Sequence, residues 1–150
     1  MQKSKYILTI IAMILISCSS VPKQAKCVKE SEKGLLINWG KQYNKTGWRV
    51  YHSINTKLEL MKVEEDSLGN KRYSDSSRIS EENYCKIKQD LVKFVVKTQA
   101  LFVPGIIQQF VEYSSPGQNV YFRAIWNPEY TNAGNKELRM FFDSLEYRAK

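Results

Sequence analysis

The sequence SEENYCKIKQDLVKFVVKT, residues 80–98, has the clearest periodicity in the chain. Its apolar positions recur at steps of three and four residues and its lysines fall on the other side, as in an amphipathic helix. The members of the apolar stripe are Tyr84, Ile87, Leu91, Phe94, Val95 and Thr98, widened by Val92 and Val96. Ser80 can cap the first turn, where Glu81 and Glu82 also favour the helix dipole. We therefore predict a helix that begins near Ser80 and ends before Pro104, because proline disfavours helical geometry in the residue before it.

The chain before this helix is predicted to form strands. Residues 48–54 alternate Trp, Val, His and Ile on one side, which is the period of a half-buried strand. Residues 58–64 follow a polar turn, and residues 71–74 follow a second turn in which Gly69 can adopt a positive φ. A short apolar run, Leu35–Trp39, is expected to pair at an edge of the sheet.

The chain after this helix is predicted to form a hairpin and a second helix. Residues 110–114 and 120–126 have alternating patterns, and the segment between them contains Pro116-Gly117, which is typical of a turn. The second helix is indicated by apolar residues at i, i+3, i+4 and i+7: Leu138, Phe141, Phe142 and Leu145. The predicted order is β-β-β-α-β-β-α. This order favours an α+β domain, an antiparallel sheet of four to five strands with two amphipathic helices packed on one face.

The N-terminus has the pattern of an export signal. Lys3 and Lys5 precede an apolar run over residues 6–16, and a basic start followed by a short apolar segment is typical of secretory signals. The run is about half as long as the roughly 20 apolar residues that span a bilayer. Its end, the sequence LISC at residues 15–18, resembles the lipobox of bacterial lipoproteins. The resemblance implies cleavage before Cys18, acylation of this cysteine with fatty acids such as palmitate, and attachment to a membrane.

This interpretation divides the chain into three parts. They are a signal peptide over residues 1–17, a flexible tether over 18–33 and a single α+β domain over 34–150. The tether is polar and rich in charge, and it has no hydrophobic period. The residue after the cysteine is Ser19 and not Asp. Under the sorting rule of enterobacterial lipoproteins, this implies an outer-membrane protein in the cell envelope that faces the periplasm.

The chain is basic, but its charges are mixed. It contains 23 Lys and Arg residues against 15 Asp and Glu residues, for a formal net charge of +8. Acidic and basic residues stand together in residues 57–66 and 136–139, whereas nucleic-acid-binding proteins collect positive charge on one face. We therefore expect no nucleic-acid partner. The expected partners are membrane lipid through the acylated Cys18, and an envelope protein or an anionic envelope component.

Two cysteines remain if Cys18 is acylated. Cys27 lies in the predicted tether and Cys85 lies near the start of the predicted helix. An even number of cysteines in an oxidising compartment is compatible with a disulfide. Two free thiols, one exposed on the tether and one buried, fit the sequence equally well. The sequence leaves the pairing open.

The sequence contains no recognised catalytic or metal-binding motif. His52 is the single histidine, and a catalytic zinc site needs three protein ligands. On an alternating strand, His52 is expected to be a packed sheet residue. Cys85 could act as a nucleophile with His52 as its base, since a helix N-terminus lowers the pKa of a thiol. Cys85 adjoins the apolar stripe, however, and we expect no catalytic residue, no metal and no cofactor.

The best candidate for a recognition surface is the loop that begins at the end of residues 120–126. It combines Arg123, Trp126 and Tyr130, residue types that are common in interaction hot spots, around the stiff Pro128. The alternative is that Trp126 closes the edge of the core. The sequence is compatible with both interpretations.

These observations predict a non-catalytic binding or interaction domain that is anchored in the cell envelope. The order of strands, central helix, hairpin and terminal helix is similar to that of emfourin-type inhibitors of thermolysin-like proteases, which implies a peptidase inhibitor as an alternative. A hydrolase that uses Cys85 and His52 is a second alternative.

Overall fold

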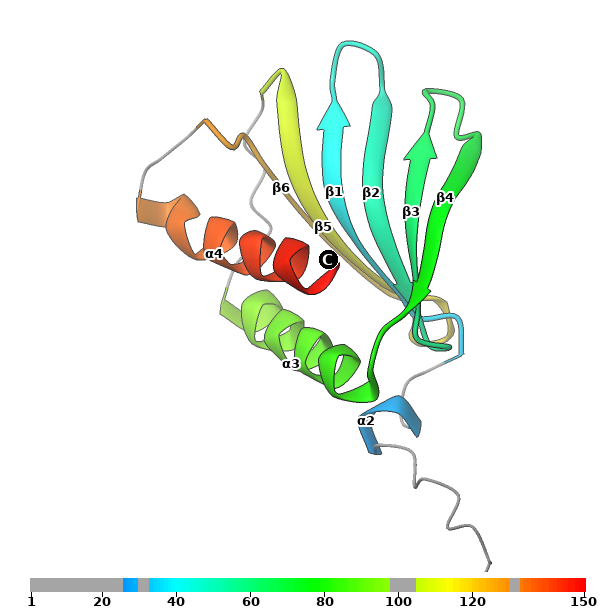
Figure 1. Ribbon diagram of the computed structural model, residues 1–150. Helices are drawn as coiled ribbons and strands as arrows, with labels where there is room; N and C mark the ends of the chain where they lie inside the picture. The colour runs from blue at the N-terminus through cyan, green and yellow to red at the C-terminus, as the bar shows by residue number, and fades with distance from the viewer. Residues whose placement is uncertain (1–25, 30–32, 98–104, 130–132) are drawn as a thin grey trace, which may run out of the picture.

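The computed structural model describes residues 26–29, 33–97, 105–129 and 133–150 (Figure 1). Within these ranges the chain forms six strands, three α-helices and one 3₁₀ turn. In chain order they are α2 (Lys26–Lys29), β1 (Leu36–Tyr43), β2 (Trp48–Asn55), β3 (Glu59–Glu65), β4 (Lys71–Arg78), α3 (Glu81–Lys97), β5 (Ile107–Ser115), η1 (Pro116–Gln118), β6 (Val120–Trp126) and α4 (Ala133–Arg148).

The six strands form one antiparallel sheet in the order β4-β3-β2-β1-β5-β6. The predicted α+β class is confirmed, but the sheet has six strands rather than four to five, and four of them precede α3. The prediction that Leu35–Trp39 pairs at an edge is wrong. β1 extends to Tyr43 and lies in the middle of the sheet, because β2 pairs with one side of it and β5 with the other.

Gly40 is the reason that the sequence pattern did not show the full length of β1. A glycine inside a strand usually weakens it, and it often marks a close approach of another backbone. Here a side chain on Gly40 would overlap the backbone of Val50 and Tyr51. The register also places Gly40 between Tyr51 and Phe110, whose ring centroids lie 5.8 Å apart in an edge-to-face arrangement. These two rings cover the position where the glycine has no side chain.

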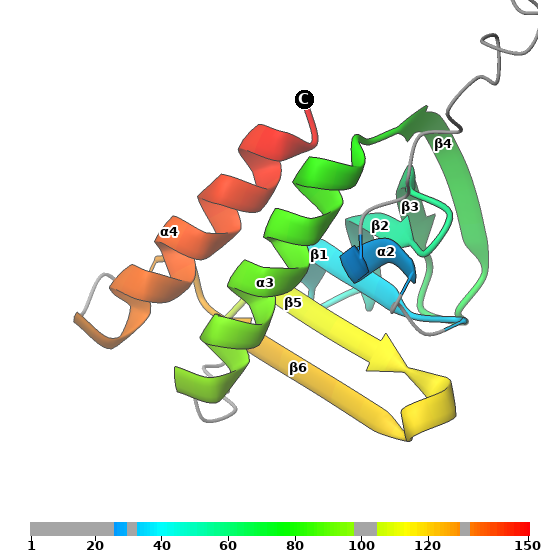
Figure 2. The same ribbon diagram turned by 90° about the horizontal axis from the view of Figure 1, so that it is seen from below.

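Helices α3 and α4 lie side by side on one face of the sheet (Figures 1 and 2). The predicted start of α3 is confirmed, since Ser80 Oγ accepts a hydrogen bond from the Asn83 amide at 3.2 Å, as a helix cap does. The predicted end of α3 before Pro104 lies outside the described residues. Within the described ranges, no helix has both the length and the apolar composition needed to cross a membrane.

The main core lies between these two helices and the sheet. Trp39 and Trp126 are its largest fully buried side chains. The Trp126 ring meets Phe142 of α4 edge to face, with the centroids 5.6 Å apart. Phe94 of α3 stacks on Phe141 of α4 at 4.8 Å. Because each large apolar side chain contributes about 1.5–3 kcal/mol when it is buried, this core holds most of the apolar stabilisation.

The short helix α2 joins the domain to the segment that precedes it. Cys27 of α2 forms a disulfide with Cys85 of α3, with the Cα atoms 5.8 Å apart, and Val28 is buried against the core. The predicted tether over residues 18–33 is therefore too long, because residues 26–29 belong to the folded domain. A helix of four residues is too short to produce a readable period, so no sequence pattern predicted it.

The opposite face of the sheet is covered by no described helix (Figure 2). It carries a second, smaller apolar cluster of Tyr51, Val63, Phe110 and Ile125. We call this side the helix-free face.

Candidate functional site

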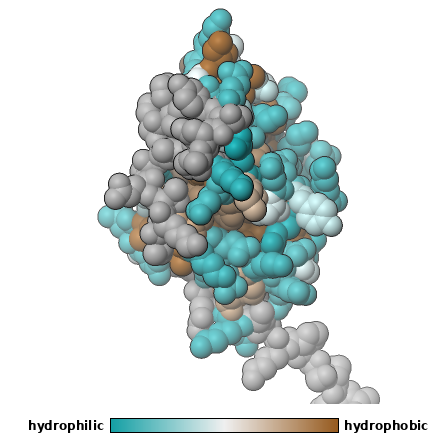
Figure 3. Space-filling model, turned by 90° about the vertical axis from the view of Figure 1, so that its left-hand side faces the viewer, coloured by the Kyte–Doolittle hydropathy of each residue, from teal (hydrophilic) through white to brown (hydrophobic). Residues whose placement is uncertain are grey.

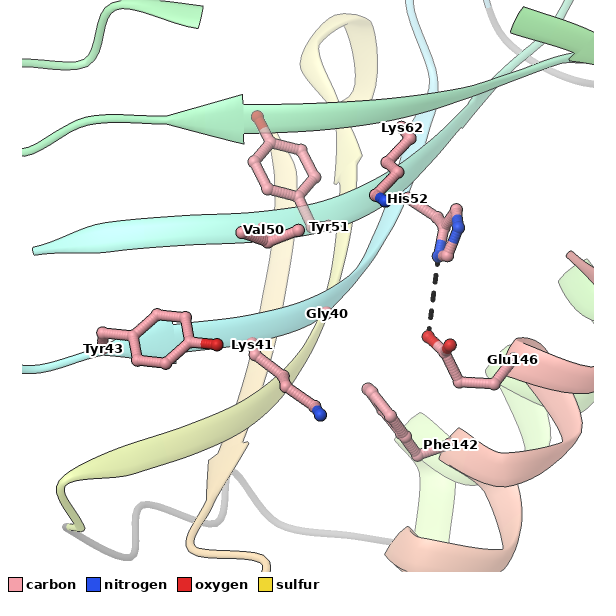
Figure 4. A pocket seen from close by; sticks show the side chains of 9 residues that line it. All are labelled: Gly40, Lys41, Tyr43, Val50, Tyr51, His52, Lys62, Phe142 and Glu146. Carbon is pink, nitrogen blue, oxygen red and sulfur yellow. Dashed lines mark ion pairs between the residues drawn. The ribbon is translucent and has the colours of Figure 1, made fainter. Parts of the chain in front are cut away.

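A cleft of about 320 Å³ lies between strands β1, β2 and β3 and the C-terminal half of α4. The side chains that point into it or border it on the helix side of the sheet are Lys41, Tyr43, Val50, His52, Lys62, Phe142 and Glu146 (Figure 4). We refer to this site as the cleft. It is the place where basic, aromatic and apolar side chains meet on the part of the sheet that α3 and α4 leave uncovered.

The strand register brings the lining residues together. Lys41 of β1 is paired with Val50 of β2, and His52 of β2 is paired with Lys62 of β3. Paired residues of neighbouring strands project from the same face of a sheet. Three consecutive strands therefore place two lysines and a histidine on one surface, facing Phe142 of α4 (Figure 4).

His52 is held in place by contacts on two sides. Its Nδ1 lies 3.5 Å from Glu146 Oε1, a contact that becomes an ion pair when the imidazole is protonated (Figure 4). Its ring also lies 5.4 Å from the ring of Trp39, between centroids. The prediction that His52 is a packed sheet residue is confirmed, and its side chain keeps 25% of its surface exposed toward the cleft region.

The two lysines of the cleft are not neutralised by the protein. Lys41 is exposed and Lys62 is half-buried. Among the described residues, neither forms an ion pair or a side-chain hydrogen bond. Glu146, the one carboxylate that borders the cleft, faces His52 instead. The cleft therefore presents positive charge that an incoming anion could neutralise.

A second polar cluster lies on the helix-free face. Arg49 Nη2 lies 2.6 Å and Arg123 Nε 3.0 Å from the same oxygen of Glu112, and Arg49 Nη1 lies 3.4 Å from Glu65 Oε1. Both guanidinium groups also lie over the ring of Phe110, at 4.4 Å and 5.5 Å from its centroid. We call these four charged residues the charged cap.

The charges of the charged cap are paired with one another, although the buried Nε atoms of Arg49 and Arg123 have no hydrogen-bond partner among the described residues. Burial alone would lower the pKa of Arg49, but the negative charge of Glu112 raises it above its ordinary value. Burial, together with a hydrogen bond that Tyr51 donates to Glu65 Oε2 at 2.7 Å, raises the pKa of Tyr51. Two arginines face two glutamates, so the charged cap has no net charge. Its geometry closes the small apolar cluster and offers less to a ligand than the cleft does.

The predicted recognition surface of Arg123, Trp126 and Tyr130 is not formed. Trp126 is fully buried, and its Nε1 donates a hydrogen bond to Gln109 Oε1 at 2.9 Å. Arg123 lies on the helix-free face, where it donates to Gln42 Oε1 at 2.5 Å. Residues three positions apart on a strand project from opposite faces, so these two side chains cannot share a surface. Trp126 is a core residue, as the alternative interpretation had it, and Tyr130 lies outside the described residues.

The cysteines fall into two groups. Cys18 lies outside the described residues, so its acylation stays a prediction. Cys27 and Cys85, whose pairing the sequence left open, are joined. A disulfide sulfur is not a thiolate nucleophile, and His52 contacts Trp39 and Glu146. The structure therefore does not assemble the hypothetical pair of Cys85 and His52.

Sequence reasoning missed the lysines and the glutamate of the cleft. One signal was present for Lys41. It follows Trp39 by two residues, so on β1 it projects from the same face as that buried side chain and places a cation there. The position of Glu146 had no comparable signal, because it depends on where α4 crosses the sheet.

In the part of the chain that the structure describes, no group of three or more His, Cys, Asp or Glu side chains is placed to hold a metal ion. The chain matches no protein-family model, and no curated protein is significantly similar to it in sequence. A functional proposal therefore depends on the residues and their geometry.

Proposed function

We propose that this chain is a lipid-anchored protein of the cell envelope whose α+β domain binds a partner or ligand without transforming it. In this proposal Cys18 becomes the acylated N-terminus, residues 19–25 form the tether, and α2 begins the folded domain. The most economical location is the outer membrane, with the domain facing the periplasm.

The disulfide between Cys27 and Cys85 is the observation that carries the proposal. Disulfides form and persist in oxidising compartments and are rare in the cytosol. The bond lies nine residues after Cys18, so it fixes the end of the tether to α3. An export signal and a structural disulfide are independent features, and both favour a location outside the cytoplasm.

The cleft supports a role in binding. It is concave, it combines apolar walls with a few polar groups, and it contains uncompensated lysines, which are features of ligand sites. Together with the lipobox resemblance, it favours an anchored binding domain over a purely structural one.

Metabolic labelling with an alkyne-tagged fatty acid tests the anchor. We expect the wild-type protein to be labelled and to sediment with membranes. The Cys18→Ser variant should lose the label, while the matched Cys27→Ser variant should keep it. Absence of label on the wild type, or equal label on Cys18→Ser, would overturn the proposal.

A further inference from the structure

We propose that the cleft binds a small soluble molecule in which one anionic group adjoins an apolar part. This inference rests on the proposed binding function and specifies its ligand class. Lys41 and Lys62 project from the strands on either side of β2, where Val50 is paired with Lys41 and His52 with Lys62 (Figure 4). An ammonium group recognises carboxylate and phosphate alike, as a point charge, so both belong to the same class here.

The positive charge of the cleft is available to a ligand because nearby carboxylates are engaged elsewhere or too distant. Glu146 faces His52 Nδ1 at 3.5 Å. Glu64 projects from the same face of β3, two residues beyond Lys62, but it borders a different hollow beside Trp48. Among the described residues, no carboxylate oxygen lies within 4 Å of either lysine ammonium. An anion would therefore gain attraction without displacing an existing ion pair.

The apolar part of the ligand is indicated by the walls and rim of the cleft. Val50 and Phe142 line it. Tyr43 borders the cleft at the end next to the β1–β2 hairpin. It is paired across the sheet with Trp48 on one side and with Ile107 on the other. Trp48 is 38% exposed and Ile107 is 40% exposed, so the rim offers a band of apolar surface beside the lysines.

The small volume of the cleft favours a small ligand over a protein. Stable protein interfaces bury about 800 Å² on each partner. On the side of the molecule seen in Figure 3, the coloured residues are mostly hydrophilic, with apolar side chains in small separate patches. The cleft, at about 320 Å³, has the size of a small-molecule site.

The position of α2 favours a soluble ligand over a lipid of the bilayer. α2, which follows the proposed tether, lies at the end of the sheet opposite the β1–β2 hairpin (Figure 1). Tyr43 and Trp48 flank that hairpin, so the apolar rim and α2 lie at opposite ends of the domain. In the proposal, the anchored segment enters the domain at α2, at the end remote from the apolar rim.

Ligand-observed NMR titrations of the full chain in phosphatidylcholine nanodiscs test the ligand class. The probes are hexanoate and hexyl phosphate, compared with acetate, which lacks the chain, and hexanol, which lacks the charge. We expect hexanoate and hexyl phosphate to bind saturably and more tightly than either comparison probe. Tightest binding of hexanol, or no saturable binding of any probe, would overturn the proposal.

A charge-matched pair of variants tests the site. The Lys41→Gln/Lys62→Gln variant should bind hexanoate about tenfold more weakly, as expected for two partly solvated ion pairs. The Lys57→Gln/Lys86→Gln variant loses the same charge at exposed positions outside the cleft and should bind like the wild type. Equal weakening in both variants would show a nonspecific charge effect and would contradict the assignment.

Competition with vesicles of phosphatidylglycerol distinguishes a site for a soluble ligand from a site for a lipid headgroup. Added to the Cys18→Ser chain, they should not displace hexanoate. Displacement that depends on Lys41 and Lys62 would assign the site to lipid and overturn the soluble ligand. None of these titrations depends on acylation. If Cys18 were not labelled by the fatty acid, their outcome would not change, so the proposed anchor and the proposed ligand class can fail separately.

Discussion

The two faces of the sheet are closed against water in different ways. Under α3 and α4, Trp39 and Trp126 are fully buried in an apolar core. On the helix-free face, Phe110 is just as completely buried, although no described helix covers it. There the guanidinium groups of Arg49 and Arg123 lie over the ring.

The difference shows that long charged side chains can shield the apolar residues of a sheet face from water, as a packed helix does. The stems and planar ends of arginines cover apolar surface while their charges stay near water. This solution depends on charge balance, because removal of one carboxylate leaves two cations facing each other. The helix side depends on volume and shape instead. The predictions that follow probe each side in turn, from the largest expected effect to the smallest.

Trp126→Ala should cause the largest loss of stability. It would leave a cavity against Phe142 and remove the hydrogen bond to Gln109, and such truncations cost about 3–5 kcal/mol. The free energy of unfolding in urea measures this. Tyr121→Ala, an exposed position on the same strand, is the control and should change stability by about 1 kcal/mol or less. Equal losses in the two variants would mean that Trp126 is not a core residue.

Removal of the disulfide should have the next largest effect on the helix side. The bond joins residues 58 positions apart and restricts the unfolded chain, so Cys27→Ser/Cys85→Ser should lose roughly 2–4 kcal/mol. Denaturation of the wild type with and without a reductant gives the same comparison without mutation. If reduction does not change the stability of the wild type, the bond is not a structural element of the native protein.

Glu112→Gln should destabilise the helix-free face by about 2 kcal/mol, less than a fully buried pair would lose, because both arginines keep some contact with solvent. The loss arises because Arg49 and Arg123 then face each other across a neutral side chain. Glu137→Gln, which removes one exposed charge on α4, is the control in urea unfolding. A Glu112 variant as stable as this control would show that the charged cap does not hold this face closed.

Tyr51→Phe should have the smallest effect, about 1 kcal/mol for one hydrogen bond, and it should depend on pH. The pKa of Tyr51 is raised by burial and by Glu65, so the folded state favours the protonated hydroxyl. Its contribution is complete below the unfolded pKa of about 10 and is lost as the pH rises through the higher folded value. The difference in stability between wild type and variant should therefore shrink above pH 10. A difference that stays constant or grows there would contradict this assignment.

The sequence predicted those parts of the fold that local patterns encode. Ser80 and the apolar stripe of α3 defined that helix, and the alternation that ends at Trp126 defined β6. The length and central place of β1 were not predictable in this way. They depend on the backbone approach at Gly40 and on pairing with β5, which lies beyond α3 in the chain.

The candidate site was less accessible from the sequence than the fold. Lys41, Lys62 and Glu146 come from β1, β3 and α4, and only the strand order and the crossing of α4 bring them together. The predicted surface of Arg123, Trp126 and Tyr130 failed for a simple reason: proximity in sequence was taken for a shared face. On a strand, two residues three positions apart project from opposite faces of the sheet.

Intact-mass measurement of the protein purified from membranes under non-reducing conditions tests the central claim most directly. We expect a chain that begins at Cys18, carries the added mass of its acyl groups and has no cysteine that can be alkylated. A chain that begins at Met1, has no added lipid and has alkylatable Cys18, Cys27 and Cys85 would contradict both the anchor and the oxidising compartment on which the proposed function depends.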